Sequence, residues 1–222
     1  MNKIIISIEG NIGVGKSTFI KIIKKLIENS DVVDEPVNRW LAIKDNNDRN
    51  ILQAFYDDKT KYGYVFQHIA YISRMMYIED KLKSSNDNKI IFLDRSMDTD
   101  KNIFAKMLYD DGFLSSMELT AYEYWCNFYT NYVRNIGKKN IIYLYCDPQI
   151  AFERIKKRNR KEELEVPFDY INKIHQYHET WMTQSNKENN ILVINCNIDF
   201  EHDLAYQYEI IEIVKAWISN IN

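Results

Sequence analysis

The chain has 222 residues, of which 45% are hydrophobic and 27% charged, and its formal net charge at pH 7 is −3. This length and composition are typical of a globular protein, and we expect one domain over residues 1–222. The slightly acidic balance gives no general reason to bind nucleic acid, and no apolar run approaches the roughly 18 residues that a membrane helix needs. We therefore expect a cytoplasmic protein without nucleic-acid or membrane partners.

The first predicted strand and helix enclose a glycine-rich motif. The apolar run Ile4–Ile8 predicts a strand buried on both faces, and the spacing of apolar residues over 17–28 predicts a helix with one apolar side. Between them lies Gly-x-x-x-x-Gly-Lys-Ser, which is a P-loop in its required strand, loop and helix context. The motif holds three of the chain's 6 glycines.

A P-loop predicts a phosphate site. Glycine lets successive backbone N–H groups approach an anion closely, and the start of the following helix adds a partial positive charge. We expect Lys16 to reach the outer phosphates and the Ser17 hydroxyl to ligate Mg²⁺. The expected phosphate-binding segment comprises Gly10, Asn11, Ile12, Gly13, Val14, Gly15, Lys16, Ser17 and Thr18.

Two acidic residues follow predicted strands. Residues 31–37 predict a short strand that stops at a proline and leaves Glu35 at its carboxyl edge, which faces the P-loop in open α/β sheets. After a long predicted helix over 62–82, residues 89–94 predict a buried strand that ends in Asp94. An acid at this place in a P-loop protein holds Mg²⁺ directly or through water.

Helices are predicted over 97–110 and 115–136, and the second has an apolar face wider than packing on one sheet requires. That face is equally compatible with a core helix and with a subunit contact. Residues 140–146 and 191–195 predict two further buried strands, and 204–218 the last helix. Strands that alternate with helices indicate an α/β fold of the P-loop kinase type, with a doubly wound five-stranded parallel sheet and flanking helices.

An arginine-rich segment follows the fourth strand. Pro148 opens a helix that carries Arg154, Arg158 and Arg160, and acidic residues follow. Planar guanidinium groups stabilise a transferring phosphoryl group well, so we interpret residues 154–165 as a lid that folds over phosphates and excludes water. The Asn-Lys-x-Asp and Asp-x-x-Gly strings of GTPases are absent, and a small kinase fits the chain better.

Four spaced motifs carry a family resemblance: Ile-Glu-Gly-Asn-Ile-Gly-Val-Gly-Lys-Ser-Thr from Ile8, Glu-Pro-Val-x-x-Trp from Glu35, Asp-Arg-Ser from Asp94, and the lid arginines. The chain resembles deoxynucleoside kinases of the deoxycytidine, deoxyguanosine and insect multisubstrate type from about residue 3 to residue 200. The resemblance implies transfer of the γ-phosphate of ATP, with Mg²⁺, to the 5′-hydroxyl of a deoxynucleoside.

The resemblance also assigns catalytic roles. Glu35 is then the general base for the 5′-hydroxyl, and Arg95 holds both Glu35 and that hydroxyl. Lys16 and the lid arginines Arg154, Arg158 and Arg160 bind the transferred phosphoryl group, and Ser17 and Asp94 serve Mg²⁺. The family often has Glu in place of Asp94, whose shorter side chain reaches less far toward the metal.

The substrate contacts implied by the resemblance are spread along the chain. Tyr56 and Glu163 are placed on the 3′-hydroxyl, Gln67 on an amide edge of the base, Phe66 and Phe104 on its two faces, and Trp40 in the same pocket. Without the resemblance, these aromatic residues fit an ordinary core. Arg74 and Asp100 form a charged pair where thymidine-preferring members are apolar, which favours dC, dA or dG. Asp199 and Phe200 resemble the loop that holds the base of ATP.

Two alternatives compete with this interpretation. A nucleoside monophosphate kinase, such as a thymidylate kinase, shares the sheet and lid but needs extra cationic groups for the acceptor phosphate. A non-catalytic structural relative usually loses the P-loop lysine or the base, and this chain retains Lys16 and Glu35. We also expect a homodimer through the helices around 64–84 and 115–137. The sequence leaves open the preferred base and the preferred phosphate donor.

Overall fold

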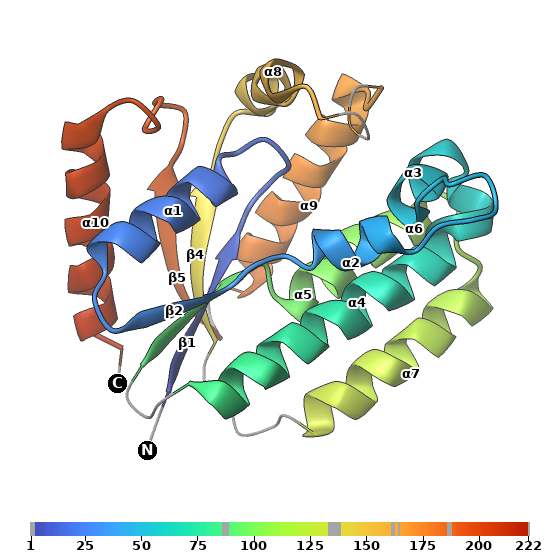
Figure 1. Cartoon of the computed structure of the whole chain (residues 1–222), viewed down its shortest axis with the longest axis horizontal. Helices are drawn as coiled ribbons and strands as arrows, with labels where there is room; N and C mark the ends of the chain where they lie inside the picture. The colour runs from blue at the N-terminus through green and yellow to red at the C-terminus, as the bar shows by residue number, and fades with distance from the viewer. Residues whose placement is uncertain are drawn as a thin grey trace.

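In a computed structural model, five parallel strands form a sheet with helices on both faces (Figure 1). The structure describes residues 3–85, 89–132, 139–160, 163, 165–185 and 188–221. The sheet order is β2-β3-β1-β4-β5, and every neighbouring pair is parallel. The strands are β1 (Ile4–Glu9), β2 (Ser30–Val33), β3 (Ile90–Asp94), β4 (Asn140–Tyr145) and β5 (Asn190–Asn195). The predicted doubly wound fold class is confirmed.

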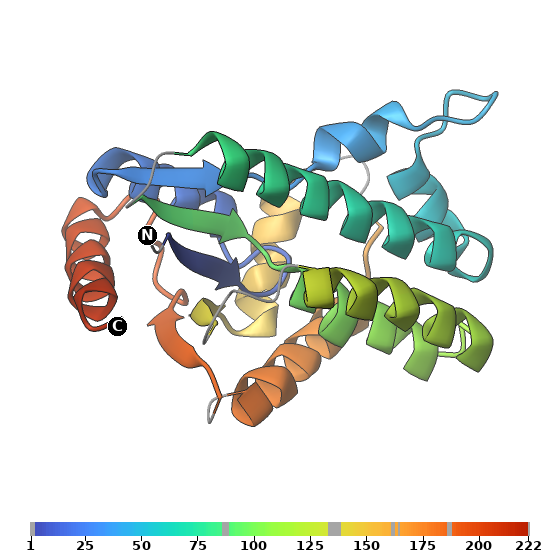
Figure 2. The same ribbon diagram turned by 90° about the horizontal axis from the view of Figure 1, so that it is seen from below.

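Two helical layers bury the sheet (Figures 1 and 2). On one face lie α1 (Lys16–Leu26) and α10 (Leu204–Ser219), and on the other lie α4 (Lys59–Ser84), α9 (Phe168–Ser185) and the π-helix η1 (Asp100–Ala105). Alternate residues of a strand serve the two layers: Phe92 packs in the cluster with α1, while Ile91 and Leu93 pack with Ile78 of α4. This double burial explains the continuous apolar runs of the strands.

The remaining helices are α2 (Val37–Ala42), α3 (Ile51–Asp57), α5 (Met97–Thr99), α6 (Lys106–Asp110), α7 (Ser116–Tyr132) and α8 (Pro148–Arg158). The predicted single helix over 97–110 is three pieces, α5, η1 and α6, with one π-helical stretch. The predicted helix 115–136 is described as far as Tyr132, and residues 133–136 lie outside the described residues. Helix α9 was not predicted, because polar residues interrupt its apolar pattern.

The carboxyl ends of three neighbouring strands bring the predicted catalytic groups to one edge. β1 and β3 align Ile8 with Asp94, so the P-loop begins beside the end of β3. The prediction of a strand over 31–37 is wrong in its end: β2 stops at Val33, and Glu35 lies in the connection to α2, which begins at Val37. The chain turns sharply after β3 because Arg95 adopts a left-handed conformation, with φ 65°.

Candidate active site

A cavity of about 790 Å³ lies at this carboxyl edge. It is lined by residues of the P-loop, of the segments at the ends of β2 and β3, of helices α3, α4, η1, α8 and α9, and of the loop before α10. The predicted site residues that line it are Ile12, Gly13, Gly15, Lys16, Ser17, Thr18, Glu35, Trp40, Tyr56, Phe66, Gln67, Arg74, Asp94, Arg95, Asp100, Phe104, Arg154, Arg158, Arg160, Glu163, Asp199 and Phe200. Of the predicted set, Gly10, Asn11 and Val14 do not line it.

The P-loop is closely packed against its surroundings. A Cβ atom at Gly13, where φ is 80°, would lie 2.2 Å from the carbonyl oxygen of Ala151, so only glycine fits there. The Asn11 side chain donates to the Ile171 carbonyl of α9 at 2.9 Å, and Val14 is fully buried. Asn11 and Val14 therefore hold the loop in place from behind the cavity.

The Lys16 side chain folds back onto the P-loop. Its Nζ donates to the carbonyl oxygens of Gly10 at 2.9 Å and Asn11 at 2.6 Å. Burial and the neighbouring charge of Arg95 lower the pKa of Lys16 to about 7. A phosphate group bound in the cavity would place negative charge beside the Lys16 ammonium and would raise its pKa again.

Glu35 is the centre of a buried charge network. One of its oxygens, Oε1, accepts hydrogen bonds from Arg74 at 3.1 Å and from Arg95 at 3.0 Å. Burial alone would raise the pKa of Glu35, but the charges of Arg95, Arg74 and Lys16 outweigh burial and lower the pKa to about 2. The carboxylate is therefore ionised at neutral pH, and two guanidinium groups fix its direction.

Arg74 connects this network to η1. Its Nε and one terminal nitrogen donate to the two oxygens of Asp100 at 2.9 and 3.3 Å, and its other terminal nitrogen donates to the Asp94 carbonyl at 2.7 Å. The side chains of Arg74 and Asp100 are only 3% and 2% exposed. The predicted charged pair is thus a buried bidentate ion pair. Asp100 is also the first residue of the π-helix η1, and π-helical segments are frequent at functional sites.

Asp94 has the character of a ligand. Its Oδ1 is buried and has no hydrogen-bond partner in the part of the chain that the structure describes. Burial and the neighbouring charge of Glu35 raise the pKa of Asp94 to about 6. An orphaned carboxylate oxygen and the Ser17 hydroxyl, both in the cavity lining, are the oxygen donors that Mg²⁺ prefers, so these residues fit such an ion.

The far end of the cavity is aromatic. The rings of Phe66 and Phe55 stack with centroids 4.7 Å apart, and Trp40 meets Phe66 edge-on at 5.4 Å. Beside them, Gln67 is 2% exposed, and its Oε1 has no hydrogen-bond partner among the described residues. A buried amide oxygen without a partner costs free energy, so this end of the cavity is suited to a flat ligand that carries a hydrogen-bond donor.

Two of the three lid arginines contact one acid. Glu163, which is buried, accepts hydrogen bonds from Arg158 and, at 3.1 Å, from Arg160. Burial and the charge of Glu163 raise the pKa of Tyr56, so this phenol stays protonated. Residues 161, 162 and 164 of the predicted lid lie outside the described residues.

Arg154 is placed differently from the other two arginines. Its guanidinium donates to backbone carbonyl oxygens of Val14 at 3.2 Å, Cys196 at 2.8 Å and Ile198 at 3.2 Å. The loop it contacts also reaches the P-loop through Phe200, because a Cβ atom at Gly15 would lie 2.8 Å from that ring. Arg154 thus joins the P-loop to the loop after β5.

Several lining residues escaped the sequence analysis. Leu52, Phe55 and Tyr170 complete the aromatic end, and Lys21 and Lys157 lie at the phosphate end. Tyr170 lies on the unpredicted helix α9, whose buried positions 171, 174, 178, 181 and 182 do follow a helical period. That period was the signal available in the sequence.

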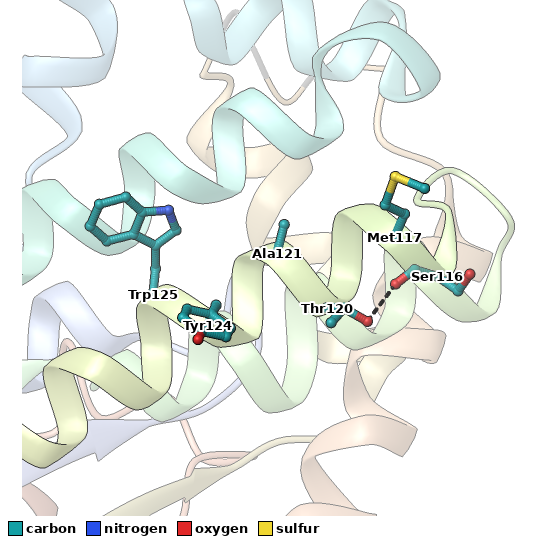
Figure 3. Close-up of a pocket in the computed structure, with 6 residues that line it drawn as sticks. All are labelled: Ser116, Met117, Thr120, Ala121, Tyr124 and Trp125. Atoms are coloured by element: carbon teal, nitrogen blue, oxygen red, sulfur yellow. Dashed lines mark hydrogen bonds between the residues drawn. The ribbon is translucent and has the colours of Figure 1, made fainter.

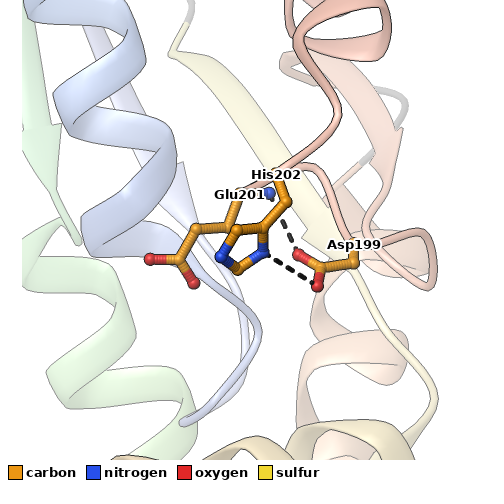
Figure 4. A group of neighbouring side chains, drawn as sticks. All are labelled: Asp199, Glu201 and His202. Atoms are coloured by element: carbon orange, nitrogen blue, oxygen red, sulfur yellow. Dashed lines mark hydrogen bonds and ion pairs between the residues drawn. The ribbon is translucent and has the colours of Figure 1, made fainter.

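Two acids of the cavity lining, Asp199 and Glu201, form a cluster with His202. The ligand atoms of Asp199, Glu201 and His202 lie within 4.8 Å of one another, and the His202 ring is 3.2 Å from Asp199 (Figure 4). All three residues are exposed, and exposed acidic groups of this kind are common without an ion. We assign no metal to this cluster.

Comparison with known proteins identifies the family. The family model for deoxynucleoside kinase matches residues 6–219. A human (Homo sapiens) deoxycytidine kinase is 34% identical, with 97% of this chain and 91% of the relative covered. Deoxycytidine kinase 2 of Gallus gallus and a mitochondrial deoxyguanosine kinase of Xenopus laevis are each 32% identical over 97% of this chain and 90% of the relative. The chain therefore belongs to the deoxynucleoside kinase family.

Proposed function

We propose that this deoxynucleoside kinase transfers the γ-phosphoryl group of ATP to the 5′-hydroxyl of a deoxynucleoside, with Glu35 as the general base. The observation that carries the proposal is the ionised Glu35 carboxylate, held by Arg74 and Arg95 in the same cavity as the P-loop lysine. Phosphoryl transfer passes through a loose transition state, so the attacking alcohol needs a well-aimed proton acceptor more than a strong one.

Cationic side chains at the phosphate end of the cavity would bind the phosphates and stabilise the transferring group. In this proposal Lys16 leaves its two carbonyl partners for the outer phosphates, and Arg158 and Arg160 bind the transferring group. Arg154, predicted as a third phosphate ligand, has its guanidinium on backbone carbonyls and would act there by holding the P-loop and the Asp199 and Phe200 loop for the base of ATP. Ser17 and Asp94 would hold Mg²⁺, which neutralises phosphate charge when it is bound with the nucleotide.

The aromatic end would select the nucleoside. Phe66 and Phe104 would contact the faces of the base, and the free Oε1 of Gln67 would accept a hydrogen bond from its amino or imide group. The charged pair Arg74 and Asp100 supports dC, dA or dG over dT. Tyr56, which remains a hydrogen-bond donor, and Glu163 would bind the 3′-hydroxyl and crowd the 2′ position.

We also propose a homodimer formed through α4 and α7. Met117 and Tyr124 of α7 are each 80% exposed, and a hollow of about 630 Å³ lies along Ser116, Met117, Thr120, Ala121, Tyr124 and Trp125 (Figure 3). Val65, Ile72 and Met76 extend the exposed apolar surface on α4. Light scattering with a mass of one chain would refute the dimer.

No helix in the part of the chain that the structure describes has the length and apolarity to cross a membrane. We propose that the enzyme acts in the cytoplasm, which cell fractionation would test.

The function is tested by ADP release from Mg-ATP with the four deoxynucleosides, the four ribonucleosides and dTMP as acceptors. The proposal predicts turnover on deoxynucleosides, highest with dC, dA or dG. Turnover on dTMP alone would make the protein a monophosphate kinase. Nucleotide binding without turnover on any acceptor would make it a non-catalytic relative.

A further inference from the structure

The last residue of β1 is a buried carboxylate outside the cavity lining. Glu9 has no exposed surface, and a buried carboxylate is costly unless its oxygens accept hydrogen bonds. Oε1 accepts from the backbone N–H of Ser96 at 2.9 Å, and Oε2 accepts from the Thr99 hydroxyl. Glu9 therefore ties the end of β1 to the segment that follows β3.

The strained residue of the site directly precedes Ser96. Arg95 has φ 65°, a left-handed conformation that costs free energy for a residue with a side chain and persists only where the surroundings enforce it. Its N–H donates to the Ile8 carbonyl at 3.1 Å, and the next N–H, that of Ser96, donates to Glu9. Two consecutive residues of β1 thus hold the two peptide groups that flank the left-handed turn.

The left-handed turn sets the direction of the Arg95 side chain. The Arg95 guanidinium donates to Glu35 at 3.0 Å and to the Gly10 carbonyl at 3.4 Å. The segment that Glu9 holds continues into η1, which presents Asp100 and Phe104 to the cavity. The side chain at position 9 faces this segment because residues 5, 7 and 9 share the sheet face opposite to α1.

We propose that Glu9 is a positioning residue, which holds Arg95 in its left-handed conformation and thereby aims the guanidinium at Glu35. This inference rests on the proposed function, in which Glu35 receives the proton of the 5′-hydroxyl. Glu9 touches neither substrate nor phosphate in this account and acts through Arg95.

The test compares Glu9→Ala with Glu9→Gln, each alone and combined with Arg95→Ala. A misplaced Arg95 should lower kcat by about 10-fold to 100-fold in Glu9→Ala, with the KM for ATP within about 2-fold of wild type because the P-loop contacts are retained. The Gln amide can accept from Ser96 and donate to the Thr99 oxygen, so Glu9→Gln should keep kcat within about 3-fold. Since Glu9 acts through Arg95, Glu9→Ala should cost less than about 2-fold in the Arg95→Ala background.

Glu179→Ala is the matched control. It removes another carboxylate that accepts a hydrogen bond, from the Tyr143 hydroxyl at 2.6 Å, but lies outside the cavity lining, and kcat should not change. If Glu9→Ala does not fold, Thr99→Val removes one of the two contacts, and kcat should fall by about 3-fold to 10-fold.

Unchanged kcat in Glu9→Ala, or in Thr99→Val where only that variant folds, would overturn the proposal. So would full additivity with Arg95→Ala, or a Glu9→Gln variant as impaired as Glu9→Ala. A crystal structure of Glu9→Ala separates this inference from the proposed function, because it reads the conformation of Arg95 directly. A wild-type protein without turnover would refute the function, whereas an Arg95 that keeps φ near 65° and its contact with Glu35 in the variant would refute the role of Glu9.

Discussion

The two ends of the cavity differ in how much of their charge is fixed inside the protein. At the nucleoside end, Arg74, Arg95 and Asp100 are buried and connected to Glu35 by several hydrogen bonds. At the phosphate end, the side chains of Arg158 and Arg160 are 39% and 40% exposed. Under the proposed function, this difference predicts that the acceptor site is set before substrate arrives, whereas the phosphate site combines the P-loop and its buried Lys16 with arginines near the surface.

The sharpest way to break this comparison is to remove Arg74. Arg74→Ala leaves the buried Asp100 carboxylate without its partner and Glu35 with Arg95 alone, and the free energy of unfolding should fall by about 3–5 kcal/mol. Urea unfolding measures this change. Replacing both members of the pair, as Arg74→Met with Asp100→Leu, should recover much of the loss, because no buried charge then lacks its partner. A double variant as unstable as Arg74→Ala would contradict the explanation.

Gln67 sharpens the account of the acceptor end. In Gln67→Leu, kcat/KM for the best deoxynucleoside should fall by about 10-fold to 100-fold, because a donor group of the bound base is left without its acceptor. The free energy of unfolding should stay the same or rise, since a buried oxygen without a partner is removed. Gln176→Leu, an exposed position on α9, is the control. A Gln67→Leu enzyme that keeps kcat/KM within about 3-fold of wild type would contradict a hydrogen bond from the base to Gln67.

A smaller effect concerns the core behind the site. His178 is fully buried, and burial lowers its pKa to about 3 from 6.5. Below pH 6.5 the unfolded chain binds a proton that the folded chain does not, so stability should fall by about 1.4 kcal/mol for each pH unit between 6.5 and 3. Asp94, whose pKa is raised in the folded protein, acts in the opposite direction below about pH 6.

The contribution of His178 is isolated by comparing how the free energy of unfolding changes with pH in wild type and in His178→Phe. Urea unfolding at pH 7.5 and pH 5.5 should show that the variant gains about 1.4 kcal/mol relative to wild type on acidification. An equal pH response in the two proteins would mean that His178 is protonated in the fold.

The smallest predicted change in stability is that of Arg160→Ala. Because this arginine is half exposed, the free energy of unfolding should change by less than about 0.5 kcal/mol, while kcat falls if it binds the transferring phosphoryl group. The matched removal of Arg74 and Arg160 tests the comparison between the two ends. A large loss of stability in Arg160→Ala would mean that the phosphate end is as firmly built as the acceptor end.

The sequence predicted the parts of this molecule that depend on local pattern. Apolar runs predicted β1, β3, β4 and β5, and the strand predicted over 31–37 coincides with β2 only as far as Val33. The P-loop and the two acids that follow β2 and β3 predicted the edge where the cavity lies. Contacts between residues far apart in the sequence could not be predicted, and the hydrogen bond from Ser96 to Glu9, 87 positions apart, is an example. Helix α9 was missed because His178 and neighbouring polar residues mask its buried side.

The proposal that Glu35 is the general base is tested most directly by kcat for the best deoxynucleoside in wild type and Glu35→Gln. Gln keeps the size of the side chain and an oxygen for Arg74 and Arg95 but cannot take the proton. The account predicts a fall in kcat of about 10²-fold to 10⁴-fold with little change in the KM for ATP. A Glu35→Gln enzyme that keeps kcat within about 3-fold of wild type would contradict the assignment.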